Sequence, residues 1–223
     1  RLLDVACGTG VVALTASRLG AEAQGIDLTP ELINRANENA KIMELKAKFV
    51  EGDAEFLPYK ENEFDIVLSQ YGHMFAPRPS IVVKELARVL KPGGILAFST
   101  WPKELFMGKF FKLIESFSQP LPPEVASPVL WGDMAVIEDR LRDHFDHIEF
   151  ARDTMFAPTM SPAHMLKLFE KNAGPLANLV KALADDPTKL SNLRNAALVL
   201  IEKFFSNNFL RQDFLMTRCV KKI

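Results

Sequence analysis

The stretch from Leu2 to Gly10 constrains this chain most, because it joins an apolar run to two glycines spaced by one residue. An acidic residue, Asp4, lies in the apolar run, and the residues after Gly10 are typical of a helix. Glycine lets the backbone approach a ligand closely, and a helix start offers free N–H groups and a positive dipole end. The Asp4 carboxylate would repel a pyrophosphate and attract an ammonium group. The turn therefore predicts a ligand with a cationic part.

Strand and helix patterns alternate through the first 100 residues. The expected strands are 1–6, 22–26, 47–51, 64–69 and 95–100, and the expected helices are 11–19, the segment after Thr29 and 80–90. Thr29 as N-cap and Pro30 at the first helical position make a strong helix start. The alternation predicts an α/β fold with a doubly wound, mostly parallel sheet.

The second half of the chain has a different character. Helices are expected at 104–117, 133–142, after Ser161, at 175–184 and at 187–205, and strands at 146–156 and 209–220. We expect residues 1–100 to form a ligand-binding core. Residues 101–223 would complete the sheet with strands at about 145–156 and 209–220, and insert a helical lid at about 103–130 and 157–206.

Two further acidic residues follow predicted strands. In doubly wound sheets, ligands bind at the carboxyl ends of the strands near the switch in strand order. Asp27 lies 19 positions after Gly8, which is the spacing at which a carboxylate receives the two hydroxyls of a ribose. Asp53 could accept a hydrogen bond from an exocyclic amine such as that of adenine. With Asp4, these residues describe a ligand with adenosine at one end and an amino acid at the other.

Several motifs in order carry a family resemblance. They are Leu2–Gly10, which matches the pattern hhDxxxGxG, and the segments 25–29, 52–58, 64–69 and 85–94. On these motifs the chain resembles the class I S-adenosylmethionine-dependent methyltransferases, in the group that includes enzymes of ubiquinone and menaquinone biosynthesis. The resemblance implies S-adenosyl-L-methionine as cofactor and S-adenosyl-L-homocysteine as product. It also implies a Rossmann-like sheet of seven strands, with an antiparallel last strand beside the fifth.

The resemblance also implies site residues. At the methionine end, Ala6, Gly8 and Gly10 would lie along the cofactor and Asp4 would bind its amino group. The adenosine end would be held by Asp27 on the ribose hydroxyls, Leu28 on the adenine face, Asp53 on the adenine amine and the Ala54 N–H on a ring nitrogen.

The residues after the fourth predicted strand are the candidates for the methyl-transfer zone. Ser69 and Gln70 would line the methionine and the transferred methyl group. Tyr71 could hydrogen-bond the substrate or the cofactor. His73 has an imidazole that titrates near neutral pH, so it could assist deprotonation or orient the substrate, although a loop histidine that packs or caps is an equally good interpretation.

Two other functional classes stay open. Gly8–Ala13 fits GxGxxA, a fingerprint of NAD(P)-dependent oxidoreductases, and Asp27 serves that interpretation too. Asp4, Asp53 and the segment 91–94 favour S-adenosylmethionine. A non-catalytic S-adenosylmethionine-binding protein would carry the same motifs as an enzyme.

Composition bounds the partners and the compartment. The formal net charge of −1, without a basic cluster, disfavours nucleic acid. Cys7 and Cys219 have no metal-ligand spacing, so we expect no metal site, and reduced thiols indicate a cytoplasmic location. No apolar run reaches the ~20 residues of a membrane span.

The methyl acceptor is expected to be a small molecule, with oxygen, nitrogen and carbon acceptors all open. Twelve of the 17 phenylalanines follow residue 100, which favours an apolar or aromatic substrate. An ordinary helical core or a dimer face, including a homodimer, would have the same composition. The chain begins at Arg1, almost inside its first strand, so we expect an N-terminal segment of the full protein to complete the pocket.

Overall fold

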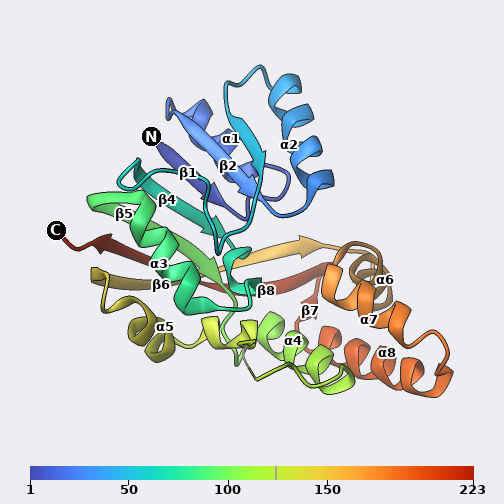
Figure 1. Ribbon diagram of the computed structural model, residues 1–223. Coiled ribbons are helices and arrows are strands. Elements are labelled where there is room, and N and C mark those ends of the chain that lie inside the picture. Colours follow the sequence, from blue (N-terminus) through green and yellow to red (C-terminus); the bar gives the residue numbers. More distant parts are fainter. Residues whose placement is uncertain (124) are drawn as a thin grey trace. The chain divides into compact units, whose positions relative to one another are not determined.

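The computed structural model describes residues 1–123 and 125–223, which form two compact units (Figure 1). The first unit comprises Arg1–Thr100, Glu124–Ala151 and Met216–Ile223, and the second comprises Trp101–Pro123 and Arg152–Leu215. Glu124 belongs to the predicted lid segment 103–130 and lies outside the described residues.

Strands that are far apart in the sequence form one sheet. They are β1 (Leu2–Val5), β2 (Ala23–Asp27), β3 (Lys48–Glu51), β4 (Phe64–Gln70), β5 (Leu90–Thr100), β6 (Phe145–Pro158), β7 (Phe205–Ser206) and β8 (Phe209–Lys221). Over the described residues their order is β3-β2-β1-β4-β5-β8-β6, with β7 paired to β8. The strand order reverses between β1 and β4, which is where doubly wound sheets bind ligands.

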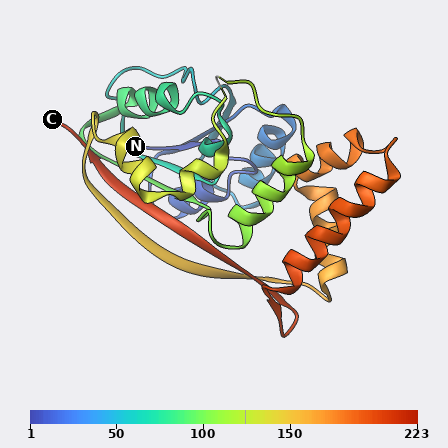
Figure 2. The same cartoon turned by 90° about the horizontal axis from the view of Figure 1, so that it is seen from below.

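The strand directions confirm the predicted Rossmann-like sheet. The pairs β1–β2, β1–β4, β2–β3 and β4–β5 are all parallel. Strand β8 runs opposite to β5 in Figure 1 and lies beside β6 in Figure 2. The last long strand is therefore inserted beside the fifth, as predicted, and the two-residue β7 is an addition to the seven expected strands.

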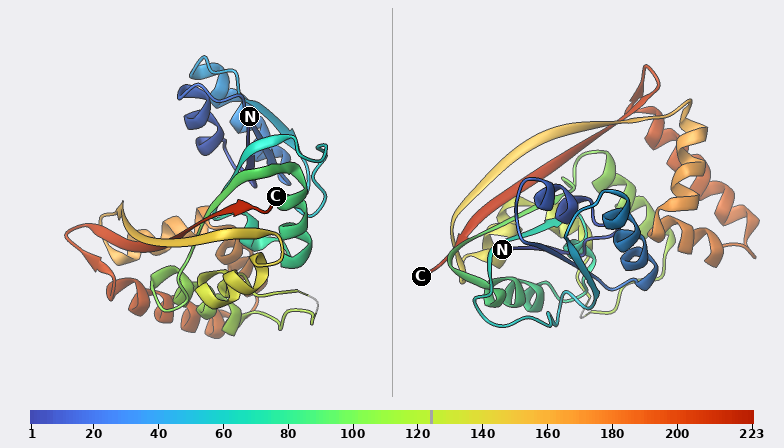
Figure 3. Two further views of the ribbon diagram at one scale, coloured as in Figure 1. Left: turned by 90° about the vertical axis from the view of Figure 1, so that its left-hand side faces the viewer. Right: turned by 90° about the horizontal axis from the view of Figure 1, so that it is seen from above.

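Helices cover both faces of the sheet in the first unit (Figure 3). They are α1 (Val11–Arg18), α2 (Pro30–Ile42), α3 (Pro79–Val89) and α5 (Met134–Leu141), with 3-10 helices η1 (His73–Phe75) and η2 (Pro128–Gly132). Leu14, Ile33 and Phe49 belong to one buried cluster between α1, α2 and the sheet. The 3.6-residue spacing of apolar residues in α2 predicts this contact.

The start of α2 differs from the expected cap in one respect. Thr29 occupies the N-cap position with extended backbone, but its side chain makes no capping hydrogen bond. Instead the Thr29 N–H donates to Asp27 Oδ1 at 2.9 Å. Pro30 occupies the first helical turn as expected, where its missing N–H costs nothing.

Strand β5 begins earlier than its apolar pattern predicts. The expected strand starts at Ile95, whereas β5 starts at Leu90, directly after α3. Phe64 pairs with Leu90 and Ile66 with Ile95, so the extra residues on β5 form an irregularity in the ladder. Gly93 adopts a φ of 75° there, which side-chain-bearing residues rarely adopt.

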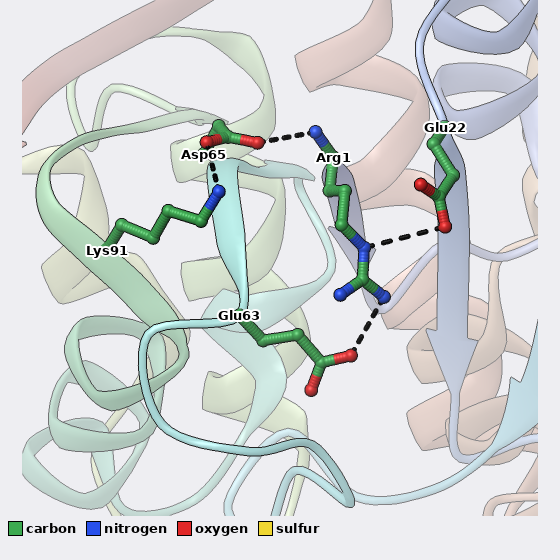
Figure 4. A network of polar contacts seen from close by, with 5 residues as sticks. All are labelled: Arg1, Glu22, Glu63, Asp65 and Lys91. Atoms are coloured by element: carbon green, nitrogen blue, oxygen red, sulfur yellow. Dashed lines mark hydrogen bonds and ion pairs between the residues drawn. The ribbon is translucent and has the colours of Figure 1, made fainter.

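Ion pairs join the amino ends of the central strands (Figure 4). Lys91 Nζ donates to Asp65 Oδ1 at 2.6 Å, and Arg1 Nη2 donates to Glu63 Oε1 at 2.9 Å. The hydrogen bond from Lys91 is the largest cause that lowers the pKa of Asp65 to about 2. These residues lie at the amino ends of the strands, away from the carboxyl ends where ligands bind. We therefore assign these ion pairs a structural role.

The second unit is built on an aromatic core. Its helices are α4 (Phe106–Phe117), α6 (Pro162–Asn172), α7 (Gly174–Ala182) and α8 (Pro187–Glu202). Phe106 is fully buried and stacks on Phe110 and Phe169, with ring centroids 5.6 and 6.1 Å away. Phe204 meets the Phe106 ring edge-on at 5.5 Å. Part of the phenylalanine enrichment after residue 100 is therefore an ordinary helical core.

The end of α8 shows a turn that the sequence prediction missed. The helix stops at Glu202 rather than Phe205, because Phe205 and Ser206 pair with Leu210 and Phe209. Asn207 and Asn208 connect them at φ of 49° and 62°. Two such residues are typical of a type I′ hairpin turn, and asparagine tolerates that backbone best after glycine.

Candidate functional site

The turn after β1 adopts a backbone that few residues tolerate. Ala6, Gly8 and Gly10 have φ of 55°, 55° and 86°. A Cβ on Gly10 would lie 2.6 Å from Phe49 Cζ, whereas a Cβ on Gly8 would meet no atom within 4 Å. Gly10 is therefore required by packing against the sheet. Gly8 leaves open space beside the backbone, which is the property expected where a ligand lies.

Asp4 carries a buried and incompletely paired carboxylate at this turn. Its Oδ2 accepts the Ala13 N–H at 3.2 Å, while Oδ1 is buried without a hydrogen-bond partner among the described residues. Burial is the largest cause that raises the pKa of Asp4 to about 7. A buried carboxylate oxygen without a partner is costly. An ammonium group is its natural complement, because it provides both charge and a donor.

Asp27 connects the β1 turn to the start of α2. Its Oδ2 accepts the Gly8 N–H at 2.8 Å and its Oδ1 accepts the Thr29 N–H. Each carboxylate oxygen has a second lone pair, so Asp27 can still accept donors such as ribose hydroxyls. Leu28, directly after it, leaves 66% of its surface exposed. An apolar side chain presented beside a carboxylate suits a flat apolar ring.

Asp53 and Ala54 follow β3, the strand next to β2. Asp53 is exposed, and its Oδ1 accepts the Glu55 N–H at 2.9 Å, which fixes the carboxylate relative to its own turn. The Gly52 N–H donates to the Asp27 carbonyl oxygen at 2.9 Å, so the two strand ends are joined. The sheet thus brings Asp4, Asp27 and Asp53 to the carboxyl ends of three adjacent strands.

Ser69 lies at the end of β4 and uses its hydroxyl inside the fold. The Ser69 Oγ donates to the Val5 carbonyl oxygen at 2.7 Å and accepts the His73 N–H at 3.1 Å. Ser69 is buried, whereas Gln70, the last residue of β4, is exposed. The lining role of both residues stays a prediction. Gln70 presents an exposed side chain, whereas Ser69 joins β1 to the loop after β4.

The loop after β4 packs tightly on the β1 turn. Tyr71 has a φ of 61°, and its N–H donates to the Ser99 carbonyl oxygen at 3.1 Å. A Cβ on Gly72 would lie 2.6 Å from the Ala6 carbonyl oxygen. Burial raises the pKa of Tyr71 to about 12, partly offset by a side-chain hydrogen bond with Ser99, so the phenol is neutral. Two left-handed non-glycine residues in contact segments indicate stored strain, which concentrates at functional sites.

His73 lies in an aromatic cluster rather than on an open surface. It is 1% exposed, with its ring centroid 4.5 Å from Phe98 and 4.7 Å from Trp131. Neither ring nitrogen has a hydrogen-bond partner in the described part of the chain. Burial is the largest cause that lowers the pKa of His73 to about 3, and Arg140 adds to it. A general base would need an accessible and basic imidazole, so the geometry favours a packing role and both predicted roles stay untested.

Two ion pairs near the site were missed by the sequence reasoning. Arg78 donates from Nε to Glu55 Oε2 at 2.7 Å, and Arg88 donates from Nε to Glu85 Oε1 at 2.6 Å. The motif 85–94 contains the second pair at helical spacing. That spacing indicates a helix-surface ion pair and gives no sign that it also reaches the loop after β3.

Known proteins resemble both the sequence and the fold. A family profile described as a methyltransferase domain matches residues 3–98. An uncharacterized protein of Mycobacterium tuberculosis is 33% identical over 97% of this chain and 79% of its own length. Phosphoethanolamine N-methyltransferase 2 of Haemonchus contortus, solved with S-adenosyl-L-methionine, aligns with a TM-score of 0.61 at 18% identity, over 100% of this chain and 49% of that one. The [4+2]-cyclase SpnF aligns at 0.59 and 24% identity, over 100% and 74%.

The contact of Gly72 with Ala6 predicts a specific effect of Gly72→Ala. The added methyl group would push the β4 loop away from the β1 turn, so S-adenosylhomocysteine affinity should fall at least ~10-fold, with ~1–3 kcal/mol lost from the free energy of unfolding. Calorimetric titration and thermal unfolding measure the two effects. Gly174→Ala is the matched control, because a Cβ there meets no atom within 4 Å. Unchanged affinity in Gly72→Ala would contradict the prediction.

The burial of His73 predicts how the reaction responds to pH and to mutation. Because its pKa is about 3, the wild-type kcat/KM profile should show no His73 ionisation between about pH 5 and 9. His73→Phe keeps an aromatic ring between Phe98 and Trp131, so kcat/KM should stay within ~3-fold. A loss of ~10²-fold or more would instead support a base or orienting role.

Proposed function

This chain belongs to the class I S-adenosylmethionine-dependent methyltransferases, and we propose that its methyl acceptor is a small organic molecule with an apolar part, bound beside the tip of β4. Its reaction is S-adenosylmethionine-dependent methyl transfer, and S-adenosyl-L-homocysteine is the product. We also propose a role for each residue of the site.

The observation that carries the cofactor site is the unpartnered Oδ1 of buried Asp4. The amino group of the methionine part would supply the missing donor and positive charge. The open space at Gly8 lets the same part of the ligand lie against the backbone, and Ala6 and Gly10 complete the turn beneath it. The residues present therefore fit S-adenosylmethionine at its methionine end.

The adenosine end fits the neighbouring strand ends. Asp27 is already oriented by two N–H donors and keeps lone pairs for the ribose hydroxyls. Leu28 would pack on the adenine face. Asp53 would accept a hydrogen bond from the adenine amine, and the Ala54 N–H would donate one to a ring nitrogen of adenine. A nicotinamide dinucleotide would instead place a pyrophosphate beside Asp4, where like charges repel.

The chain contributes mainly positioning to the reaction. When bound, S-adenosylmethionine supplies an electrophilic methyl group on a sulfonium. The protein must hold a nucleophile in line and exclude water, and good alignment can supply ~7–11 kcal/mol. The neutral Tyr71 phenol and the exposed Gln70 amide are suited to orienting an acceptor by hydrogen bonds. A base is needed only where the nucleophile must lose a proton early.

Two features support a small acceptor with an apolar part. The net charge of −1, without a block of basic residues in the sequence, disfavours a nucleic acid as the acceptor. Phe75, in the loop after β4, leaves 47% of its surface exposed close to Tyr71 in sequence, so an apolar contact is available there.

None of the helices in the described ranges is long and apolar enough to cross a membrane. A cytoplasmic location and a homodimer stay predictions.

Cofactor binding should depend on pH through Asp4. Its pKa of about 7 without ligand means that a proton must leave before the carboxylate can pair with an ammonium group. The affinity for S-adenosylhomocysteine should therefore rise with pH from about 6 to 8, approaching tenfold per unit on the acidic side. Isothermal titration across this range measures the slope.

Two controls make this slope specific. 5′-Methylthioadenosine keeps the adenosine part and lacks the amino group, so its affinity should be flat over the same pH range. Asp4→Asn keeps an acceptor for the Ala13 N–H but cannot ionise, so its affinity for S-adenosylhomocysteine should be lower and flat. A slope that persists in Asp4→Asn would assign the effect to another group.

Turnover tests the proposed acceptor class. The full-length protein should release S-adenosylhomocysteine with a small organic acceptor from a metabolite panel, faster than without acceptor. It should bind S-adenosylmethionine and not NADH. Binding without turnover above the acceptor-free rate would support the non-catalytic alternative, and NADH binding would support the oxidoreductase.

A further inference from the structure

We propose that Arg88 and Glu85 are positioning residues for adenine recognition, acting through the backbone of the segment 53–59. Neither side chain would touch the cofactor. The inference rests on the proposed function, because the adenine contacts of Asp53 and Ala54 belong to that proposal.

Arg88 reaches from α3 to two carbonyl groups of this segment. Its Nη1 donates to the Tyr59 carbonyl oxygen at 2.7 Å and its Nη2 donates to the Leu57 carbonyl oxygen at 2.9 Å. The planar guanidinium fixes the separation of its donors. It therefore sets the distance and direction between two backbone groups that lie two residues apart.

Glu85 completes the contact from the preceding turn of the same helix. Its Oε2 accepts the Leu57 N–H at 2.7 Å, and both its oxygens accept donors from Arg88. The hydrogen bonds between the two side chains stabilise their charged forms. Arg88 lowers the pKa of Glu85, and Glu85 raises the pKa of Arg88. Leu57 thus has both its N–H and its carbonyl oxygen held by charged groups, and such hydrogen bonds are stronger than neutral ones.

The segment needs this support because it has little regular structure of its own. Residues 52–63, between β3 and β4, contain no helix and no strand, only an isolated bridge between Asp53 and Phe56. Backbone groups outside helices and sheets must find other partners. By contrast, α3 is firmly placed, since Val82, Val83 and Leu86 are buried against the sheet.

A second arginine–glutamate pair, Arg78 with Glu55, orients the residues of the proposed adenine contact. Glu55 is 7% exposed and accepts the Arg78 N–H at 2.6 Å as well as its guanidinium. The Glu55 N–H in turn donates to Asp53 Oδ1. Asp53 and Ala54 are therefore oriented by a backbone that two arginine–glutamate pairs hold, one at the start of α3 and one near its end.

The test compares two ligands that differ at the adenine amine and at the neighbouring ring nitrogen N1. S-Inosylhomocysteine carries a carbonyl oxygen where S-adenosylhomocysteine has the amine, and an N–H where adenine N1 accepts. It therefore lacks the amine that would donate to Asp53 and the N1 acceptor on the same edge of the base. The wild-type protein should prefer S-adenosylhomocysteine at least ~10-fold, as expected for a hydrogen bond to a charged group. In Arg88→Met the preference should fall to within ~3-fold. Calorimetric titration of each protein with both ligands gives the ratio.

A ratio within one protein separates positioning from general stability. Loss of folded protein lowers the titratable fraction for both ligands equally and leaves the preference unchanged. Arg35→Met is the matched control, because Arg35 forms an exposed pair with Glu38 at the same helical spacing on α2. It should keep the full preference. Arg88→Lys keeps the charge but cannot hold both carbonyls, so its preference should be intermediate.

The possible results distinguish an error in the adenine assignment from an error in the positioning role of Arg88. If the wild type does not distinguish the two ligands, the adenine assignment of the proposed function is wrong and the inference falls with it. If the wild type discriminates and Arg88→Met does so equally well, the adenine assignment stands and the positioning role is overturned. If Arg88→Met does not fold, an undiminished preference in Arg88→Lys overturns the role.

Discussion

The two hydrogen bonds accepted by Asp27 hold together the part of the fold on which the site depends. One carboxylate oxygen takes the Gly8 N–H from the turn after β1, and the other takes the Thr29 N–H at the start of α2. Charge-assisted bonds of this kind are about twice as strong as neutral ones. Because the turn has three residues at positive φ, it needs an external partner to keep its shape, and the end of the neighbouring strand provides one.

Much of the strand and helix pattern of the first 100 residues was predictable, because β1 is one continuous buried run and α2 and α3 each begin with a proline in the first turn. The errors lie where strand pairing overrides the pattern of the individual segment. Leu90 joins β5 because Phe64 pairs with it, and Phe205 leaves α8 because Leu210 pairs with it. Phe64 is far from Leu90 in the sequence, so no local pattern at Leu90 encodes that partner. The Asn207–Asn208 pair, by contrast, is a local turn signal that the helical pattern of the preceding residues outweighed.

The candidate site was also only partly predictable from the sequence. Residue type and spacing identify Asp4, Asp27 and Asp53, since strand ends in a parallel sheet lie together whatever the loops do. They do not distinguish Gly8, which faces open space, from Gly10, which faces Phe49. Nor do they show that the Ser69 hydroxyl is used by Val5 and His73, because that depends on how the ends of β1 and β4 align.

The proposed acceptor side depends more on tertiary packing than the proposed cofactor side does. His73 has an ordinary position in the sequence, directly after a strand tip, but the rings of Phe98 and Trp131 enclose it and remove its basicity. The same loop keeps Tyr71 in a strained conformation against the β1 turn. The groups proposed for the cofactor and for the acceptor therefore share one close contact, Ala6 against Gly72, and a shift of either loop must displace the other. In the proposed mechanism, where alignment supplies most of the rate, we expect that contact to matter more than any single polar side chain.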